Sequence, residues 1–263
     1  MTVTALAVTN AEHEPVGLLE PWLAAAGVAV STVPAWDGTP LPGSWREAGE
    51  AGARGLIVMG GPQSAYDDRE TLQPDSPWLP EVKKLLAEAT AAGAPVLAVC
   101  LGAQLLAEAC GGLVRPGDAG SELGARLVAK RDAAAGDPVF GPLPMTPDVV
   151  QWHWDTIAVL PPGATLLASS PTYPNQAFRI GRSYGLQFHI ETTPEIVAGW
   201  AAHDAGLLGA GESAYGGQPD GTGRVDVPRL LDGIVHVQEQ MEATWRPAVE
   251  RFAGMLSEQT GNG

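Results

Sequence analysis

The first hundred residues alternate between two hydrophobic patterns. Residues 79–92 place Val82, Leu85, Leu86 and Ala89 on one helical face, which predicts an amphipathic helix with Pro80 in its first turn. On either side of it, short apolar and β-branched runs have the length and composition of buried strands, at residues 4–8, 28–33, 55–59 and 95–99. Strands that alternate with helices predict a mostly parallel sheet with helices on both faces.

After Gly112 the pattern changes to shorter strands separated by turns. We expect strands at residues 149–153 and 164–168, and a hairpin over residues 176–187 that turns near Gly181. A helix over residues 194–202 would close the core.

The C-terminal part has a different composition. Residues 206–223 are rich in glycine and are expected to form a loop. From Val227 onward apolar residues recur in steps of three and four, which predicts one or two amphipathic helices that pack on the core or, as the alternative, contact a partner. We therefore expect a three-layer α/β/α domain over residues 1–203 and a loop with a helical extension over residues 204–263, packed on that domain.

Composition and charge exclude several classes of protein. The chain has 15 Lys and Arg against 30 Asp and Glu, a net charge of −15, whereas nucleic-acid binding normally needs clustered basic residues. There is no apolar run of about 18 residues, as a membrane-spanning helix needs, and the first residues lack the basic flank of a signal peptide. We expect a cytoplasmic protein without nucleic-acid or membrane partners.

The chain has two cysteines, Cys100 and Cys110, which are too few for a disulfide framework or for a structural zinc site built mainly of thiolates. It also lacks the Gly-x-x-x-x-Gly-Lys-Ser/Thr loop that cradles phosphates. No metal or cofactor is expected. Each cysteine is then a separate candidate for catalysis or for packing.

Cys100 lies where a buried-strand pattern runs into a helix pattern. A residue on such a turn is lifted above the carboxyl edge of the sheet, and the helix N-terminus behind it favours a thiolate. Ala98 and Gly102 are small, as a sharp turn requires. On this segment alone, a nucleophile and a small buried apolar side chain remain equal alternatives. Cys110, at the other end of the helix, is expected to serve only in packing.

A cysteine nucleophile needs a base, and the base needs a group that orients it. His189 and Glu191 provide both if they lie on an extended strand end, because residues two apart then face the same side. Taken singly, a histidine at a strand end is more often a hydrogen-bonded structural residue, and Glu191 could be the first-turn acid of the following helix.

Four motifs in order carry a resemblance that covers roughly residues 1–200. The chain resembles the class I (triad) glutamine amidotransferases, and more narrowly the stand-alone proteins similar to the glutaminase domain of GMP synthase, with a flavodoxin-like fold. The motifs are Gly60-Gly-Pro-Gln-Ser-Ala-Tyr66, Val99-Cys-Leu-Gly-Ala-Gln104, Gln151-Trp-His-Trp-Asp155 and Gln187-Phe-His-Ile-Glu191.

The resemblance implies a role for each motif. Cys100 would be the nucleophile, His189 its base and Glu191 the orienting acid. The N–H groups of Gly61 and Leu101 would form an oxyanion hole. The substrate-binding residues that it implies are Gly60, Gln104, Gln151, Trp152 and His153, with Ser64, Tyr66 and Asp155 at the rim of the pocket.

Three positions depart from the family pattern. Ala98 stands where these families usually have Gly, Ile190 replaces the usual Pro between the catalytic His and Glu, and Trp154 stands where GMP synthases have Gly. Trp154 would narrow the entrance of the pocket, so the leaving group or acceptor is expected to differ.

Three functions are compatible with these observations. The first is a glutaminase that forms a γ-glutamyl thioester on Cys100 and releases ammonia to a separate synthase. The second is a hydrolase of γ-glutamyl peptides or amines, which uses the same thioester. The third is an inactive binding or regulatory protein of the same fold. The oligomeric state is left open.

Overall fold

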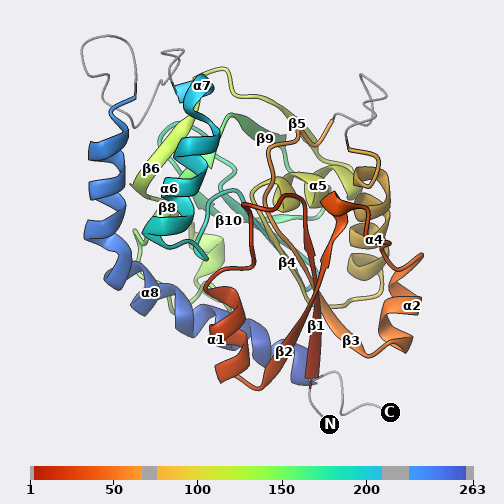
Figure 1. The fold of residues 1–263 in the computed structure, drawn as a ribbon. Coiled ribbons are helices and arrows are strands. Elements are labelled where there is room, and N and C mark those ends of the chain that lie inside the picture. The colour runs from red at the N-terminus through yellow and green to blue at the C-terminus, as the bar shows by residue number, and fades with distance from the viewer. Residues whose placement is uncertain (1–2, 67–75, 209–224, 259–263) are drawn as a thin grey trace.

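The structure, a computed structural model, describes residues 3–66, 76–208 and 225–258. Its centre is an eight-stranded sheet in the order β2-β1-β3-β4-β12-β11-β10-β7 (Figure 1). The parallel strands are β1 (Val3–Thr9), β2 (Val28–Pro34), β3 (Ala53–Val58), β4 (Val96–Val99) and β12 (Ser183–Leu186). The antiparallel edge is formed by β11 (Ala177–Ile180), β10 (Thr165–Ser169) and β7 (Ala129–Lys130).

Helices cover both faces of this sheet, which confirms the predicted three-layer arrangement. One apolar cluster joins the sheet to α1 (Leu19–Ala25), α6 (Pro194–His203) and α8 (Val227–Glu258). The other joins it to α2 (Trp45–Glu50), α4 (Leu79–Ala91) and α5 (Leu101–Ala109). Short helices α7 (Ala205–Leu208), η1 (Ala35–Asp37) and η2 (Asp132–Ala134) complete the helical elements of the described residues.

Two small two-stranded antiparallel sheets lie near the carboxyl ends of the parallel strands. They are formed by β5 (Leu113–Pro116) with β9 (Asp155–Val159), and by β6 (Glu122–Leu127) with β8 (Asp148–His153). A further bridge pairs Val150 of β8 with His189, beyond the end of β12. The small sheet β6-β8 is thereby fixed against the segment that carries the predicted base.

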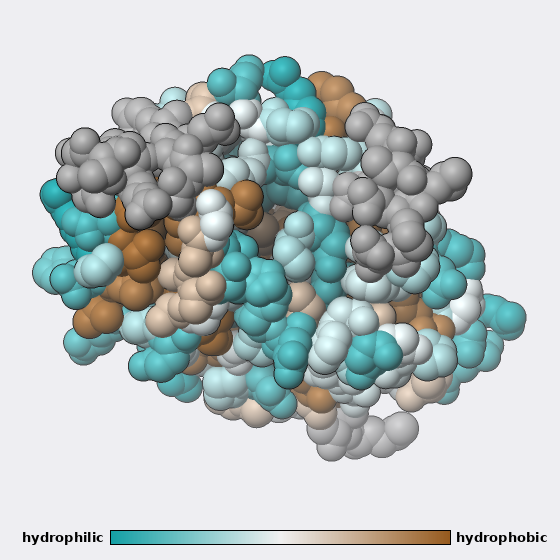
Figure 2. Space-filling view, turned by 45° about the horizontal axis from the view of Figure 1, so that its top comes forward, coloured by the Kyte–Doolittle hydropathy of each residue, from teal (hydrophilic) through white to brown (hydrophobic). Residues whose placement is uncertain are grey.

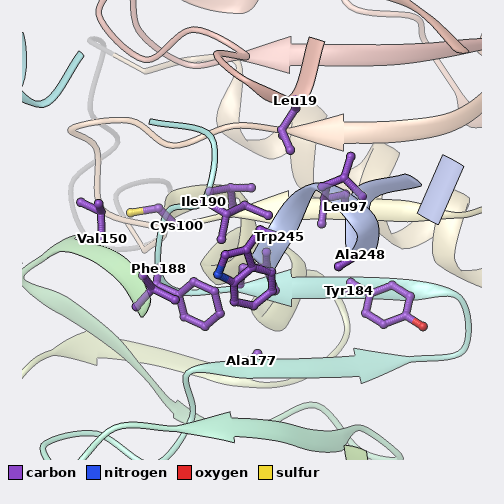
Figure 3. Packing of buried hydrophobic residues seen from close by; sticks show 14 of the residues in the cluster. Leu19, Leu97, Cys100, Val150, Ala177, Tyr184, Phe188, Ile190, Trp245 and Ala248 are labelled. Atoms are coloured by element: carbon purple, nitrogen blue, oxygen red, sulfur yellow. The ribbon is translucent and has the colours of Figure 1, made fainter. Parts of the chain in front are cut away.

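The C-terminal apolar pattern forms one continuous helix, α8, which runs beside α1 and α6 (Figure 1). Its Trp245 lies against Phe188, with ring centroids 5.4 Å apart, and its indole N–H donates to the Asp148 carbonyl at 2.8 Å. Figure 3 shows this indole within the apolar cluster that also contains Ile190 and Tyr184. The helix therefore packs on the core directly behind the candidate site. None of the helices in the described ranges is both long and apolar enough to cross a membrane.

Some elements differ from the sequence predictions. Helices between the first strands were expected without bounds, and they are α1 and α2. Strands β5, β6, β7 and β9 were not predicted, since none has more than six residues and periodicity is weak over such lengths. The prediction that a loop begins at residue 206 is wrong, because α7 spans Ala205–Leu208 and buries Leu208. Residues 209–223 of that predicted loop lie outside the described residues.

Candidate active site

Cys100 lies on a strained turn between β4 and α5. Its φ of 52° and ψ of −112° make it the only non-glycine residue with a positive φ in the described part of the chain. The Cys100 N–H donates to the Leu186 carbonyl at 2.7 Å, and the Cys100 carbonyl accepts from the Gln104 N–H at 3.0 Å. Backbone strain of this kind persists only where the surrounding structure enforces it. A strained strand-to-helix turn is typical of a position that carries a nucleophile.

His189 and Glu191 form a buried pair. The His189 Nδ1 lies 2.7 Å from Glu191 Oε1, and both side chains are almost fully buried. The prediction that they lie on a strand end needs correction, because β12 ends at Leu186. His189 lies three residues later, where its N–H donates to the Val150 carbonyl (2.8 Å) and its carbonyl accepts from the Val150 N–H (3.1 Å). That bridge keeps the segment extended and leaves both side chains on one side.

Cys100 and His189 act on each other electrostatically. Burial raises the pKa of the Cys100 thiol, and the nearby imidazole opposes that rise. Burial also disfavours a charged His189, but the charges of Glu191 and Cys100 outweigh it and raise the pKa of this imidazole well above its ordinary value. The thiol donates to the Trp152 carbonyl at 3.8 Å, and His189 Nε2 has no well-aligned hydrogen bond with the described residues. The imidazole is therefore poised to accept the thiol proton.

Gly61 and Leu101, the predicted oxyanion donors, are neighbours. A Cβ placed on Gly61 would lie 2.9 Å from Leu101 Cδ2. Leu101 is the first residue of α5, so its N–H has no acceptor within the helix. Both residues line the same cavity as Cys100. That their N–H groups form an oxyanion hole stays a prediction.

A cavity of about 310 Å³ opens over Cys100 at the carboxyl edge of the sheet. Figure 2 turns this edge toward the viewer and shows a hollow near the centre of the face. Of the predicted binding residues, Gln104, Trp152 and His153 line the cavity. Gly60 and Gln151 are not among the lining residues. Gln151 instead donates its side-chain amide to Gln176 Oε1 at 2.7 Å, within the core.

The residues expected at the rim are tied together by Asp155. Its carboxylate accepts from the Ser64 hydroxyl at 2.6 Å and from the Tyr66 hydroxyl at 3.0 Å. Its backbone carbonyl interacts with His153 Nδ1 at 2.8 Å and accepts from the Gln104 amide at 3.3 Å. These contacts hold the third motif beside the first turn of α5.

The arrangement of these motifs agrees with a comparison of sequences. The family model described as glutamine amidotransferase class-I matches residues 22–197, more than half of the chain. The chain belongs to this family.

The relatives of this chain include proteins of different length. A glutamine-hydrolyzing GMP synthase of Thermomicrobium roseum is 37% identical over 152 residues, which are 58% of this chain and 26% of that enzyme. The chain thus spans about a quarter of the length of that synthase. A putative glutamine amidotransferase-like protein of Salmonella typhimurium is 30% identical over 199 residues, which are 74% of this chain and 79% of that protein.

Solved structures share the fold. A glutamine amidotransferase from Thermotoga maritima superimposes with a TM-score of 0.78 at 26% identity, and the match covers 96% of this chain and 99% of the other. Because nearly the whole of both chains is covered, the likeness extends to α8.

The departure at Ile190 gives this protein a contact that proline could not make. The Ile190 N–H donates to Glu191 Oε2 at 2.9 Å, while Glu191 Oε1 faces His189. Proline has no N–H, so this donor would be absent. The carboxylate is therefore fixed at both oxygens, and the Ile190 side chain is buried against the apolar cluster behind it.

Strand β8, which carries the cavity-lining residues Trp152 and His153, is supported by a second network. His153 Nε2 lies 3.2 Å from Glu122 Oε2, and the same oxygen accepts from the Gln176 amide at 2.6 Å. Burial of Glu122 opposes ionisation, but the hydrogen bond and charge of His153 together hold the pKa of this carboxyl below its usual value. The network orients β8, whose Trp152 carbonyl accepts a hydrogen bond from the Cys100 thiol.

Sequence reasoning did not identify several residues that line the cavity, among them Glu14, Trp200 and Asp204. The Trp200 ring lies 4.6 Å from that of His189, centroid to centroid, and its indole N–H donates to the His13 carbonyl at 2.8 Å. Asp204 accepts from the Trp152 indole at 2.8 Å. Glu14 lies in the loop after β1, where no periodic pattern or motif indicates it. Among the described residues, no group of three or more His, Cys, Asp or Glu side chains could hold a metal ion.

We expect Glu14 to make the stability of the protein depend on pH. Burial raises its pKa from 4.5 to about 8, with Glu191 and Asp204 adding to the rise and His189 opposing it. Between these values the folded state holds a proton that the unfolded state has lost, so the free energy of unfolding falls as pH rises from 4.5 to 8. Glu14→Gln removes this dependence. The difference between the melting temperature of the variant and that of wild type should therefore increase by about 3 °C or more from the lower to the higher of these pH values.

Glu12→Gln is the matched control, because Glu12 is an exposed neighbour in the same loop. Melting curves of the three proteins at both ends of the pH range measure the effect. Parallel pH dependence of Glu14→Gln and wild type would contradict the assignment.

Proposed function

We propose that this amidotransferase cleaves the γ-amide of glutamine through a γ-glutamyl thioester on Cys100 and passes the ammonia to a separate synthase. The observation that carries the proposal is the strained, buried Cys100 at the floor of a cavity, with the His189 and Glu191 pair beside it. Family membership supports the same chemistry.

In the first half of the reaction, His189 Nε2 takes the proton from the Cys100 thiol, and the sulfur attacks the γ-carbonyl carbon. The developing oxyanion is stabilised by the N–H groups of Gly61 and Leu101. When the intermediate collapses, the C–N bond breaks and the imidazolium protonates the leaving nitrogen. Glu191 holds the ring orientation and stabilises its positive charge throughout.

In the second half, water replaces the departed ammonia. His189 takes a proton from this water, and the hydroxide attacks the thioester carbonyl. Collapse of the second oxyanion breaks the C–S bond, and the sulfur recovers its proton from the imidazolium. The sum is glutamine plus water giving glutamate plus ammonia, with the enzyme regenerated.

A γ-glutamyl amide with a substituted nitrogen is the second candidate substrate. The cavity extends beyond Cys100 to Trp154, Asp204 and Leu207, which leaves space on its outer side for more than an unsubstituted amide. The triad chemistry is the same for both substrates, so the difference lies in the group that departs.

The proposal is tested with a glutamine analogue that carries a diazoketone in place of the amide. We expect mass spectrometry of the digested protein to find one modification, on Cys100, together with loss of glutamine hydrolysis. Cys110 is the internal control. It is the C-cap of α5, and burial raises the pKa of its thiol without a histidine beside it.

Modification of Cys110 alone, or of neither cysteine, would refute the proposal. The second of these results, with no turnover of glutamine or of any γ-glutamyl amide, would favour the inactive binding protein instead.

A further inference from the structure

Glu14 is a buried acid in the cavity that the proposed mechanism does not use. It is 7% exposed, and its Oε2 has no hydrogen-bond partner among the described residues. A buried carboxyl oxygen without a partner is costly, so its presence indicates a ligand group that completes it. The β1–α1 loop holds it in place, since the Leu18 N–H of this loop donates to the Glu191 carbonyl at 2.8 Å.

The Glu14 carboxyl lies beside the imidazole of His189. A Cβ on Gly60 would lie 2.6 Å from Glu14 Oε2 and 3.3 Å from His189 Cε1, so both groups border the same small volume. The leaving nitrogen takes its proton from His189 and must therefore lie close to this ring. A leaving nitrogen next to the His189 ring, and any substituent on it, would therefore also lie near the Glu14 carboxyl.

Carboxylates outnumber basic side chains around this part of the cavity, where His13 and His153 are the imidazoles among the described lining residues. Glu14, Asp155 and Asp204 all line the cavity, and its described lining contains no Lys or Arg. Asp204 is near enough to Glu14 to affect its ionisation. A carboxylate entering this space would be repelled by three acids, whereas an ammonium group would be attracted.

We propose that Glu14 is a specificity-determining residue, which accepts a hydrogen bond from the leaving amine and selects γ-glutamyl amides whose leaving amine carries a positive charge. This inference rests on the proposed function and narrows its second candidate. γ-Glutamyl peptides, whose leaving group carries a carboxylate, are disfavoured by the same charges.

The ionisation of Glu14 agrees with this role. Burial raises the pKa of Glu14 to about 8, with Glu191 and Asp204 contributing and His189 opposing. A cation beside the carboxyl favours its ionised form. Substrates are therefore best compared at about pH 8, where ionising Glu14 costs little.

The test uses three glutamate amides that share a propylene tail and differ only in its end. They are formed with diaminopropane, butylamine and γ-aminobutyrate, whose tails end in ammonium, methyl and carboxylate. We expect kcat/KM of the wild-type protein to decrease in that order, with the ammonium tail favoured over the carboxylate tail by at least about tenfold. This ranking requires no variant.

Glu14→Gln keeps the size of the side chain and removes its charge. We expect the ratio of kcat/KM for the ammonium tail over the carboxylate tail to fall by about tenfold in this variant. Glu12→Gln, in the exposed part of the same loop, should leave the ratio unchanged.

Preference for the carboxylate tail, equal rejection of all three tails with hydrolysis of glutamine alone, or an unchanged ratio in Glu14→Gln would overturn this inference while leaving the proposed function intact. If no amide is hydrolysed and the glutamine analogue fails to label Cys100, the proposed function fails, and this inference fails with it.

Discussion

Cys100→Ser is expected to lower the turnover of glutamine by at least about a thousandfold. A hydroxyl is far less acidic than a thiol, so the imidazole removes its proton much less readily. The side chain is buried and differs by a single atom, so the fold should be retained. Ammonia release under saturating glutamine measures the loss, and circular dichroism checks the fold.

Cys110→Ser is the matched control for this substitution. Cys110 lies at the far end of α5 and does not line the cavity. Its variant should keep turnover within about twofold, in the range expected of a substitution away from the site. Comparable losses in both variants would mean that the effect comes from weakened packing of α5.

Gly102→Ala is expected to destabilise the protein by about 3 kcal/mol, because the elbow has no room for a methyl group. A Cβ at Gly102 would overlap the carbonyl oxygen of Val58 and lie 2.8 Å from its carbonyl carbon and 3.2 Å from the Met59 oxygen. These atoms belong to the backbone of the sheet and of the segment after β3, so they cannot move aside cheaply. Thermal unfolding should show a melting temperature lower by about 6 °C or more.

Gly199→Ala tests whether any glycine-to-alanine change in a helix has this effect. Gly199 is an exposed position within α6, and a Cβ there meets nothing within 4 Å. Alanine should therefore stabilise the protein by about 0.5–1 kcal/mol. If Gly102→Ala is as stable as wild type, the elbow is not as tightly packed as the contacts indicate.

The strands of the parallel half and helix α4 were predictable because their sequences carry strong periodic signals. Residues 79–92 were predicted as a helix, and α4 spans Leu79–Ala91. For the C-terminal segment, the sequence could not decide between one helix and two, because the spacing of apolar residues does not show whether a helix continues through Pro247. In the structure α8 continues through Pro247.

The candidate triad was predictable for a different reason. The small residues Ala98 and Gly102 indicate a tight turn at Cys100, and the two-residue separation of His189 and Glu191 suits a pair that faces one way. Glu14 could not be found in this manner. Its approach to His189 depends on how the β1–α1 loop folds over Glu191, and such a contact leaves no periodic signal in the sequence.

The pairing of β4 with β12 also bears on when the proposed pair of Cys100 and His189 can form. The two strands are neighbours in the sheet but are made far apart in time on the ribosome, so a growing chain exposes the sulfur long before its proton acceptor has been synthesised. Until β12 arrives, the cysteine remains an ordinary thiol. The proposed nucleophile and its base therefore meet only once the last strand of the parallel half is in place.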